Sequence, residues 1–370
     1  MDDEGVGDTP ATALRRGWTT GACATAATKA AWQALLTGTF PDPVEIVLPR
    51  GQRPAFALAI TEAGEGFARA GIVKDAGDDP DVTHGALIVS TVRRGAPGRG
   101  VTFVAGEGVG TVTKPGLPLP PGEPAINPVP RRLMREVVAE VAAAHGVSAD
   151  VVIELSVPDG VRIAEQTWNG RLGIVGGLSI LGTTGVVIPY SCSAWITSIR
   201  QGVDVARAAG HPHVAGCTGS TSEAAVQAAL GLPDSAMLDM GDFVGALLKH
   251  LRRRPVPRLT IGGGFAKLSK LAIGHLDLHS GRSQVDLDHL ARTLAALGAD
   301  GDVVTRARGA NTALEVLEIA GPLAGALADA VARDAQRVAS TVLADAPVAV
   351  DIIVVDRTGA IRGMSPRPNL

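Results

Sequence analysis

The strongest constraint on the fold is a glycine-rich stretch in the middle of the chain, residues 169–191. It places six glycines between Gly170 and Gly185, with apolar residues on both sides. Glycine lets the backbone reach positive φ and lets N–H groups approach a ligand without a Cβ in the way. The stretch therefore predicts a binding loop anchored by its apolar flanks. Glycine-rich β-structure with a bulge or a tight hairpin needs no ligand and is the alternative.

Five segments of the chain carry a resemblance to a known family. The longest is RLGIVGGLSILGTTGVV, from Arg171 to Val187. The others are TTGACATAATK (19–29), KDAGDDPDVTHG (74–85), GEGVGTVTKPG (106–116) and AINPVP (125–130). These segments, in this order, resemble the cobalt-precorrin-5B C1-methyltransferases of anaerobic cobalamin biosynthesis. The resemblance implies an enzyme that methylates C1 of cobalt-precorrin-5B with S-adenosylmethionine to give cobalt-precorrin-6A.

Length and composition predict a folded protein of two domains. A chain of 370 residues exceeds what one hydrophobic core usually holds. With 3% aromatic residues and a net charge of −3, it lacks the stacking platform and the basic surface that nucleic-acid binding needs. No apolar run reaches the ~18 residues of a membrane span, and the acidic N-terminus does not look like a signal peptide. Three scattered cysteines fit a reducing compartment, so we expect a cytoplasmic protein.

Residues 14–190 predict an α+β domain. Thr19 and Thr20 are candidate N-caps for an alanine-rich helix that runs to about Leu36, and Gly38 is placed to end it. The small side chains would let this helix lie very close to a sheet. Turn residues separate the predicted strands, and a second helix precedes the last of them: strands 44–48, 55–60, 67–73, 85–92, 101–104 and 151–157, helix 131–145.

Residues 191–345 predict an α/β domain. Strands and helices alternate there, which indicates βα units and a mainly parallel sheet. A β-rich run at 348–355 is expected to return to one of the two sheets. One option is therefore that residues 346–370 complete the first domain.

The glycine turn at 106–110 does not predict a methyltransferase of the Rossmann type. Such a loop needs a helix directly after it, aimed at the ligand. Residues 111–113 instead continue as strand, and a proline-rich stretch follows from 115 to 130. We therefore interpret this segment as a β-turn. A better context occurs at 262–267, where glycines follow a strand and open a helix near Lys267. That turn predicts either an anion site or simple close packing.

Two further clusters contain side chains of the kinds that bind metal ions. Residues 74–84 hold four carboxylates within seven positions, which suit a divalent ion, hydrogen bonds to a ligand, or a solvated turn. His211, His213 and Cys217 form an array without an apparent fourth ligand. We expect no protein-bound metal.

If the ligands are those that the resemblance implies, site residues can be assigned. Methyl transfer to an electron-rich carbon mainly needs alignment and exclusion of water, and a proton-removing group is optional. The candidates for that group are Asp79 and His84. The residues expected to bind S-adenosylmethionine are Gly176, Gly177, Ser179, Gly182, Thr183, Thr184, Gly185, Asp75 and Asp78. Those expected to bind the corrinoid substrate are Thr19, Thr20, Gly21, Arg171 and Lys267.

Two other functions stay open at this point. One is a non-catalytic corrinoid-binding or channelling protein of the same pathway. The other is phosphate-ester chemistry at residues 262–267. A homo-oligomer and transient contacts with neighbouring pathway enzymes are also left open.

Overall fold

The computed structural model describes residues 14–366, so the acidic N-terminus considered above lies outside the described residues. The chain divides into two compact units. The first comprises the residues up to Thr113 together with Pro118–Ser191, and the second comprises Lys114–Leu117 and the residues from Cys192 onward. Within the described range, no helix is both long enough and apolar enough to cross a membrane.

The first unit is built on a five-stranded sheet. Its order is β4-β5-β6-β9-β7, and neighbouring strands are antiparallel except for the parallel pair β7 and β9. The strands are β4 (Ile60–Gly64), β5 (Phe67–Val73), β6 (Leu87–Arg94), β7 (Val101–Ala105) and β9 (Val151–Ser156).

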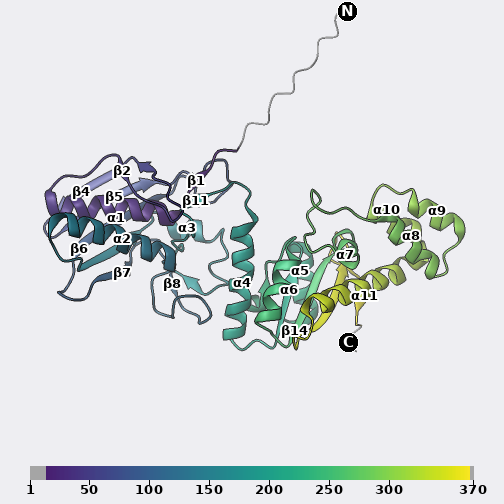
Figure 1. Ribbon diagram of the computed structural model, residues 1–370. Helices are drawn as coiled ribbons and strands as arrows, with labels where there is room; N and C mark the ends of the chain where they lie inside the picture. The colour runs from purple at the N-terminus through teal and green to yellow at the C-terminus, as the bar shows by residue number, and fades with distance from the viewer. Residues whose placement is uncertain (1–13, 367–370) are drawn as a thin grey trace, which may run out of the picture. The chain divides into compact units, whose positions relative to one another are not determined.

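Helix α1 (Thr20–Thr37) lies against β5 and β6, with α2 (Pro128–His145) beside it (Figure 1). The alanines of α1 are fully buried, and Thr28 Oγ1 lies 2.9 Å from Ser90 Oγ of β6, so the helix does approach the sheet closely. Both predicted caps are confirmed. Thr19 Oγ1 accepts from the N–H of Ala22 at 3.2 Å, and Gly38 closes the helix with φ of 75°.

Short elements surround this core. β1 (Gly17–Trp18) pairs with β11 (Val186–Val187), β2 (Val44–Glu45) with β3 (Ala55–Phe56), and β8 (Thr111–Val112) with β10 (Ile174–Val175). Helix α3 (Gly160–Ala164) completes the set. The predicted β-turn is confirmed: the N–H of Val109 donates to Gly106 O at 3.2 Å, and strand β8, not a helix, follows.

The second unit has its own sheet, in the order β13-β12-β14-β15-β16. The first four strands are parallel and β16 is antiparallel. The strands are β12 (His213–Cys217), β13 (Met237–Leu238), β14 (Arg258–Gly264), β15 (Ala349–Val355) and β16 (Ile361–Ser365). The C-terminal strands β15 and β16 therefore belong to the second unit. The option that residues 346–370 complete the first domain is wrong, because β15 pairs along the whole length of β14.

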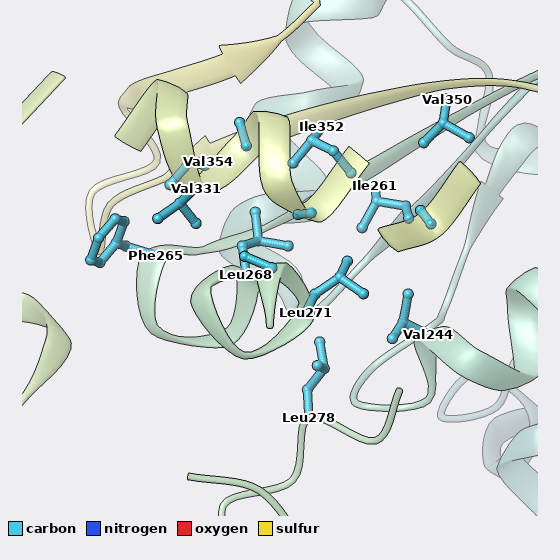
Figure 2. Packing of buried hydrophobic residues seen from close by; sticks show 14 of the residues in the cluster. Val244, Ile261, Phe265, Leu268, Leu271, Leu278, Val331, Val350, Ile352 and Val354 are labelled. Atoms are coloured by element: carbon cyan, nitrogen blue, oxygen red, sulfur yellow. The ribbon is translucent and has the colours of Figure 1, made fainter. Parts of the chain in front are cut away.

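Helices cover the sheet of the second unit. Side chains of α7, including Leu268 and Leu271, pack with Ile261 of β14, Ile352 of β15 and Val331 of α11 (Figure 2). The helices are α4 (Cys192–Ala208), α5 (Ser220–Leu230), α6 (Val244–Arg253), α7 (Phe265–Ala272), α8 (Leu287–Ala296), α9 (Gly301–Arg308), α10 (Ala313–Ala320) and α11 (Ala324–Leu343). Of these, α9 was not predicted.

Candidate functional site

The glycine-rich segment of the first unit joins three of the five segments singled out in the sequence. The N–H of Leu178 donates to Gly108 O at 2.9 Å, and the N–H of Gly110 donates to Leu178 O at 2.8 Å. On the other side, the N–H of Ile180 donates to Ala125 O at 2.8 Å. Residues 178–180 therefore run as an extended strand between two loops that lie far away in the sequence.

The following residues, 181–185, contact the start of α1. The N–H groups of Thr19 and Gly21 donate to Gly185 O and Leu181 O at 3.0 and 2.9 Å. The Thr20 hydroxyl both donates to Leu181 O and accepts from the N–H of Leu181. Since these groups are already engaged, Thr19, Thr20 and Gly21 hold the glycine-rich loop in place. Their role as substrate-binding residues stays a prediction.

The acidic loop, residues 74–84, lies on the other side of residues 15–18. The N–H of Trp18 donates to Asp75 O at 2.7 Å, and the guanidinium of Arg15 pairs with the Asp75 carboxylate. That hydrogen bond from Arg15, together with one from the N–H of Gly77, lowers the pKa of Asp75 to about 2. Asp79 Oδ1 accepts from the N–H of Tyr190 at 2.7 Å, so the acidic loop also contacts the end of the glycine-rich segment.

A buried ion pair fixes the shape of the acidic loop. Lys74 is 1% exposed, and its amine lies 2.6 Å from Asp81 Oδ2. Burial raises the pKa of Asp81, but the charge of Lys74 and hydrogen bonds from Lys74 and Thr83 outweigh this effect and leave the pKa below its ordinary value. The loop is thus an ordered turn. No group of three or more histidine, cysteine or acidic side chains in the described range is arranged to hold a metal ion.

His84 stands at the end of this loop with 53% of its side chain exposed. Its Nδ1 accepts from the N–H of Ala76 at 3.1 Å. A neutral imidazole that accepts at Nδ1 carries its proton on Nε2. In that form, Nε2 of His84 is a hydrogen-bond donor. The proton-accepting role that the sequence suggested for His84 stays a prediction.

Open main-chain amides remain in the glycine-rich segment. The N–H groups of Gly176 and Gly177, and those of residues 182–185, have no hydrogen-bond partner among residues 14–366. Gly176, Leu181 and Thr183 are exposed, so the segment is not sealed inside the core. Close packing also explains part of the glycine content: a Cβ at Gly182 would lie 2.3 Å from Thr19 Oγ1. The two interpretations of this stretch therefore apply to different glycines.

The apolar flanks of the loop were expected to anchor it, but apolar side chains that follow these amides in the sequence are exposed. Leu181 is 46% exposed, Ile188 47% and Tyr190 68%. The guanidinium of Arg171 lies 4.5 Å from the centre of the Trp168 ring. Leu181 could have been singled out from the sequence, because it is a large apolar residue within a run of glycines, where the backbone conformation does not call for one.

Of the remaining predicted residues, Ser179 and Asp78 lie in the glycine-rich segment and the acidic loop, and the others lie in the second unit. Ser179 Oγ is 3.5 Å from Asn169 Oδ1, and Asp78 Oδ2 accepts from the N–H of Arg15 at 2.6 Å. Lys267 belongs to the second unit, where its amine lies 2.8 Å from Asp242 Oδ1 and donates to Thr218 O at 3.0 Å. His211 and His213 bond to Ser235 and Thr260 hydroxyls.

Comparisons with known proteins identify the family. Residues 8–189 match the family model CbiD, and residues 277–366 match the model CbiD, C-terminal domain. A Paramagnetospirillum magneticum protein named cobalt-precorrin-5B C(1)-methyltransferase is 64% identical over 95% of this chain and 98% of its own length. Proteins of the same name from Rhodospirillum rubrum and Brucella anthropi are 65% and 63% identical, over 95% and 94% of this chain and 97% and 95% of theirs.

A solved structure is also similar, namely the cobalamin biosynthesis protein (cbiD) from Archaeoglobus fulgidus. It is 28% identical, with a TM-score of 0.39, over 73% of this chain and 83% of its own. The sequence matches alone, which extend over nearly the whole chain, confirm the resemblance that the five segments predicted. This chain belongs to the CbiD family.

Proposed function

We propose that this protein is a cobalt-precorrin-5B C1-methyltransferase that uses S-adenosylmethionine. The observation that carries the proposal is that relatives of this name are 62–65% identical over 94–95% of the chain. Those names favour an enzyme over a non-catalytic corrinoid carrier. We also propose a cytoplasmic location, which the free thiols of Cys23, Cys192 and Cys217 support.

The open amides suit the methyl donor, S-adenosylmethionine, which supplies an activated methyl group on a sulfonium. Its amino-acid carboxylate needs several hydrogen-bond donors, and the N–H groups of residues 182–185 would supply them, with Gly176 and Gly177 nearby in the sequence. The Thr183 hydroxyl is exposed and adds another donor. Asp78 is exposed and would accept from ribose hydroxyls. Asp75, which is paired with Arg15, would support the loop.

The exposed apolar side chains suit the acceptor. A corrinoid presents a broad apolar ring and many carboxylate arms, so its site needs apolar walls and cations. Leu181, Ile188 and Tyr190 would contact the ring, and Arg171 would meet a carboxylate arm. For Lys267 we propose a supporting role within the second unit, because its amine is already paired.

The protein's contribution to the reaction is alignment. An electron-rich ring carbon attacks the methyl group in line while the sulfur–methyl bond breaks and S-adenosylhomocysteine leaves. Holding the two reactants together can supply roughly 7–11 kcal/mol. A carboxylate that accepts a proton from the methylated ring would assist. Of the two candidates, Asp79 fits this role, since Oδ1 accepts from Tyr190 and Oδ2 has no partner among the described residues. His84 would donate through Nε2.

The test is turnover with a labelled donor. The protein is incubated with cobalt-precorrin-5B and S-adenosylmethionine that carries a 13C methyl group, and the product is analysed by mass spectrometry and NMR. We expect one labelled methyl group at C1. Thr183→Val, which removes an exposed hydroxyl, should weaken donor binding several-fold, whereas the matched variant Thr305→Val in α9 should not. Corrinoid binding without any transfer would instead support a carrier protein.

A further inference from the structure

The second unit contains a cavity of about 400 Å³ that the proposed function does not use. Its wall is formed by the loop after β12, the start of α7, two leucines of α10 and the turn after β15. These segments follow the carboxyl ends of three parallel strands. Within this unit, the cavity is therefore at the edge of the sheet where α/β proteins bind ligands.

The cavity lies between two neighbouring strands, β12 and β14, whose following strands are added on opposite sides of the sheet. From β12 the chain continues through α5 to β13 on one side, and from β14 it continues through α7 to β15 on the other. Neighbouring strands β12 and β14 therefore send their helices in opposite directions. Open α/β sheets leave a crevice at such a point, and ligands occupy it.

Two helices begin at the cavity without a side-chain cap. Gly219 precedes α5 and Gly264 precedes α7, and neither helix start is capped by a side chain. The first N–H groups of a helix have no partner within the helix and carry a partial positive charge. A Cβ built at Gly219 or at Gly264 would meet nothing within 4 Å. Both glycines therefore have open space beside the backbone where the two helices begin.

A buried hydroxyl gives independent support. Thr218 lines the cavity and is only 8% exposed, yet its hydroxyl forms no hydrogen bond with any residue between 14 and 366. The Thr218 oxygen itself is still accessible, so it can hydrogen-bond to a ligand in the cavity. Ser220 and Thr221, which also line the cavity, offer two more hydroxyls without a partner in the described chain. A bound ligand would satisfy all three.

Charge and shape indicate the kind of ligand. Arg357 lines the cavity and has no ion-pair partner in the part of the chain that the structure describes, whereas Arg362 is paired with Asp356 at 2.6 Å. The lining also has an apolar part, formed by Phe265, Leu314 and Leu317. Phe265 also belongs to the buried core of this unit, together with Val331 and Val354 (Figure 2). An anionic group would face the amides, and an apolar body would face the leucines.

We propose that this cavity binds a small molecule that carries a carboxylate or a phosphate beside a planar apolar body. A volume of about 400 Å³ suits a ligand of nucleotide size. The anionic group contacts the amides at the starts of α5 and α7, the Thr218 hydroxyl and Arg357. The planar part contacts Phe265 and the leucines of α10. This site is additional to the contacts proposed for methyl transfer and does not depend on them.

The test uses ligand pairs that differ in the anionic group. AMP is compared with adenosine, and S-adenosylhomocysteine with methylthioadenosine, by calorimetry and by hydrogen exchange of the full chain. We expect at least one anionic member to bind and to protect peptides covering residues 218–222 and 264–268, with its neutral partner roughly tenfold weaker. Protection by AMP identifies a phosphate ligand. Protection by S-adenosylhomocysteine identifies a carboxylate ligand, and because this compound is the demethylated donor, the donor contacts proposed at residues 182–185 would then be wrong.

Variants complete the test. Gly264→Ala adds one methyl group in front of the amides, and Thr218→Val removes the buried hydroxyl without changing the side chain's shape. Each should weaken binding roughly tenfold, whereas Gly325→Ala in α11, also in open space, should not change it. Protection confined to residues 176–185, binding that is equal in these variants, or no binding of any probe would overturn the proposal. Methyl transfer measured separately shows whether the proposed function holds in either case.

Discussion

The two glycine-rich regions of this protein use glycine for different reasons. In the first unit, a Cβ at Gly177, Gly182 or Gly185 would lie 2.2, 2.3 or 2.5 Å from an atom of another segment. In the second unit, a Cβ at Gly219 or Gly264 would meet nothing. The first set is required by packing, since real Cβ atoms do not approach other atoms so closely. The second set leaves open space beside the backbone, which we propose that a ligand occupies.

Glycine therefore serves two purposes in this protein: some glycines are needed for packing, and others leave space for a ligand. Close contacts at Gly177, Gly182 and Gly185 fix the path of the loop, and the loop then presents amides that no described residue uses. In the second unit the helices α5 and α7 fix the path instead, so their glycines are free of that task. Substitution by alanine should therefore affect stability at Gly177, Gly182 and Gly185, and ligand binding at Gly219 and Gly264.

The largest effect is expected for Gly182→Ala. At φ of 136° an alanine is strained, and its Cβ would displace Thr19, the N-cap of α1. Strain and overpacking together should cost roughly 4 kcal/mol of the free energy of unfolding. Urea unfolding measures it. Gly176→Ala is the control, because its site is open and only the strain at φ of 88° applies, about 1 kcal/mol. Equal costs would show that packing does not distinguish these glycines.

The next effect concerns the acidic loop that supports the first region. Lys74→Met leaves the Asp81 carboxylate half-buried without its partner and should cost roughly 3 kcal/mol at pH 7. Because the folded pKa of Asp81 is below its ordinary value, the pair stabilises the protein above that ordinary value and loses its effect as the pH falls through the folded pKa.

The difference between wild type and Lys74→Met should thus shrink as unfolding is measured from pH 7 towards about pH 3. Lys29→Met provides a matched control. Lys29 pairs with the exposed Glu140 at 2.8 Å, so its loss should cost under about 1 kcal/mol. A gap between Lys74→Met and wild type that widens on acidification would contradict the assignment.

The elements of the fold could be predicted from local signals. Thr19 and Gly38 mark the two ends of α1 because capping depends only on neighbouring residues. The sheet that β15 joins could not be predicted, since an apolar strand fits either core and the pairing with β14 links residues about ninety positions apart. Helix α9 was missed because its sequence, GDVVTRAR, begins with glycine and has little apolar periodicity.

The candidate site, too, could be predicted only where its signals are local in the sequence. Motif segments identified the glycine-rich loop and the acidic loop, but not the hydrogen bonds that consume the donors of Thr20 and Gly21. The orientation of His84 depends on a single bond from the N–H of Ala76. Whether a polar group is free is a property of tertiary contacts, and spacing along the chain does not reveal it.

A smaller effect is expected for the two titratable candidates of the first region. Asp79→Asn keeps a side chain of the same shape but cannot accept a proton, so kcat should fall roughly tenfold, at the low end for proton transfer because the ring carbon is already electron-rich. His84→Gln should change kcat less than threefold, since Nε2 of the neutral ring only donates a hydrogen bond. Single-turnover methyl transfer measures both. A larger loss for His84→Gln than for Asp79→Asn would reverse the two roles.

The smallest effect on stability is expected for Gly264→Ala, which completes the comparison. Its φ of −67° is allowed for alanine and its Cβ has open space. Alanine is a poorer N-cap than glycine, but it also lowers the entropy of the unfolded chain, and these terms nearly cancel. We expect the free energy of unfolding to change by less than about 0.5 kcal/mol. A loss above about 1 kcal/mol in urea unfolding would mean that Gly264, like Gly182, serves packing, and the glycines of the second unit would then give no reason to expect a ligand.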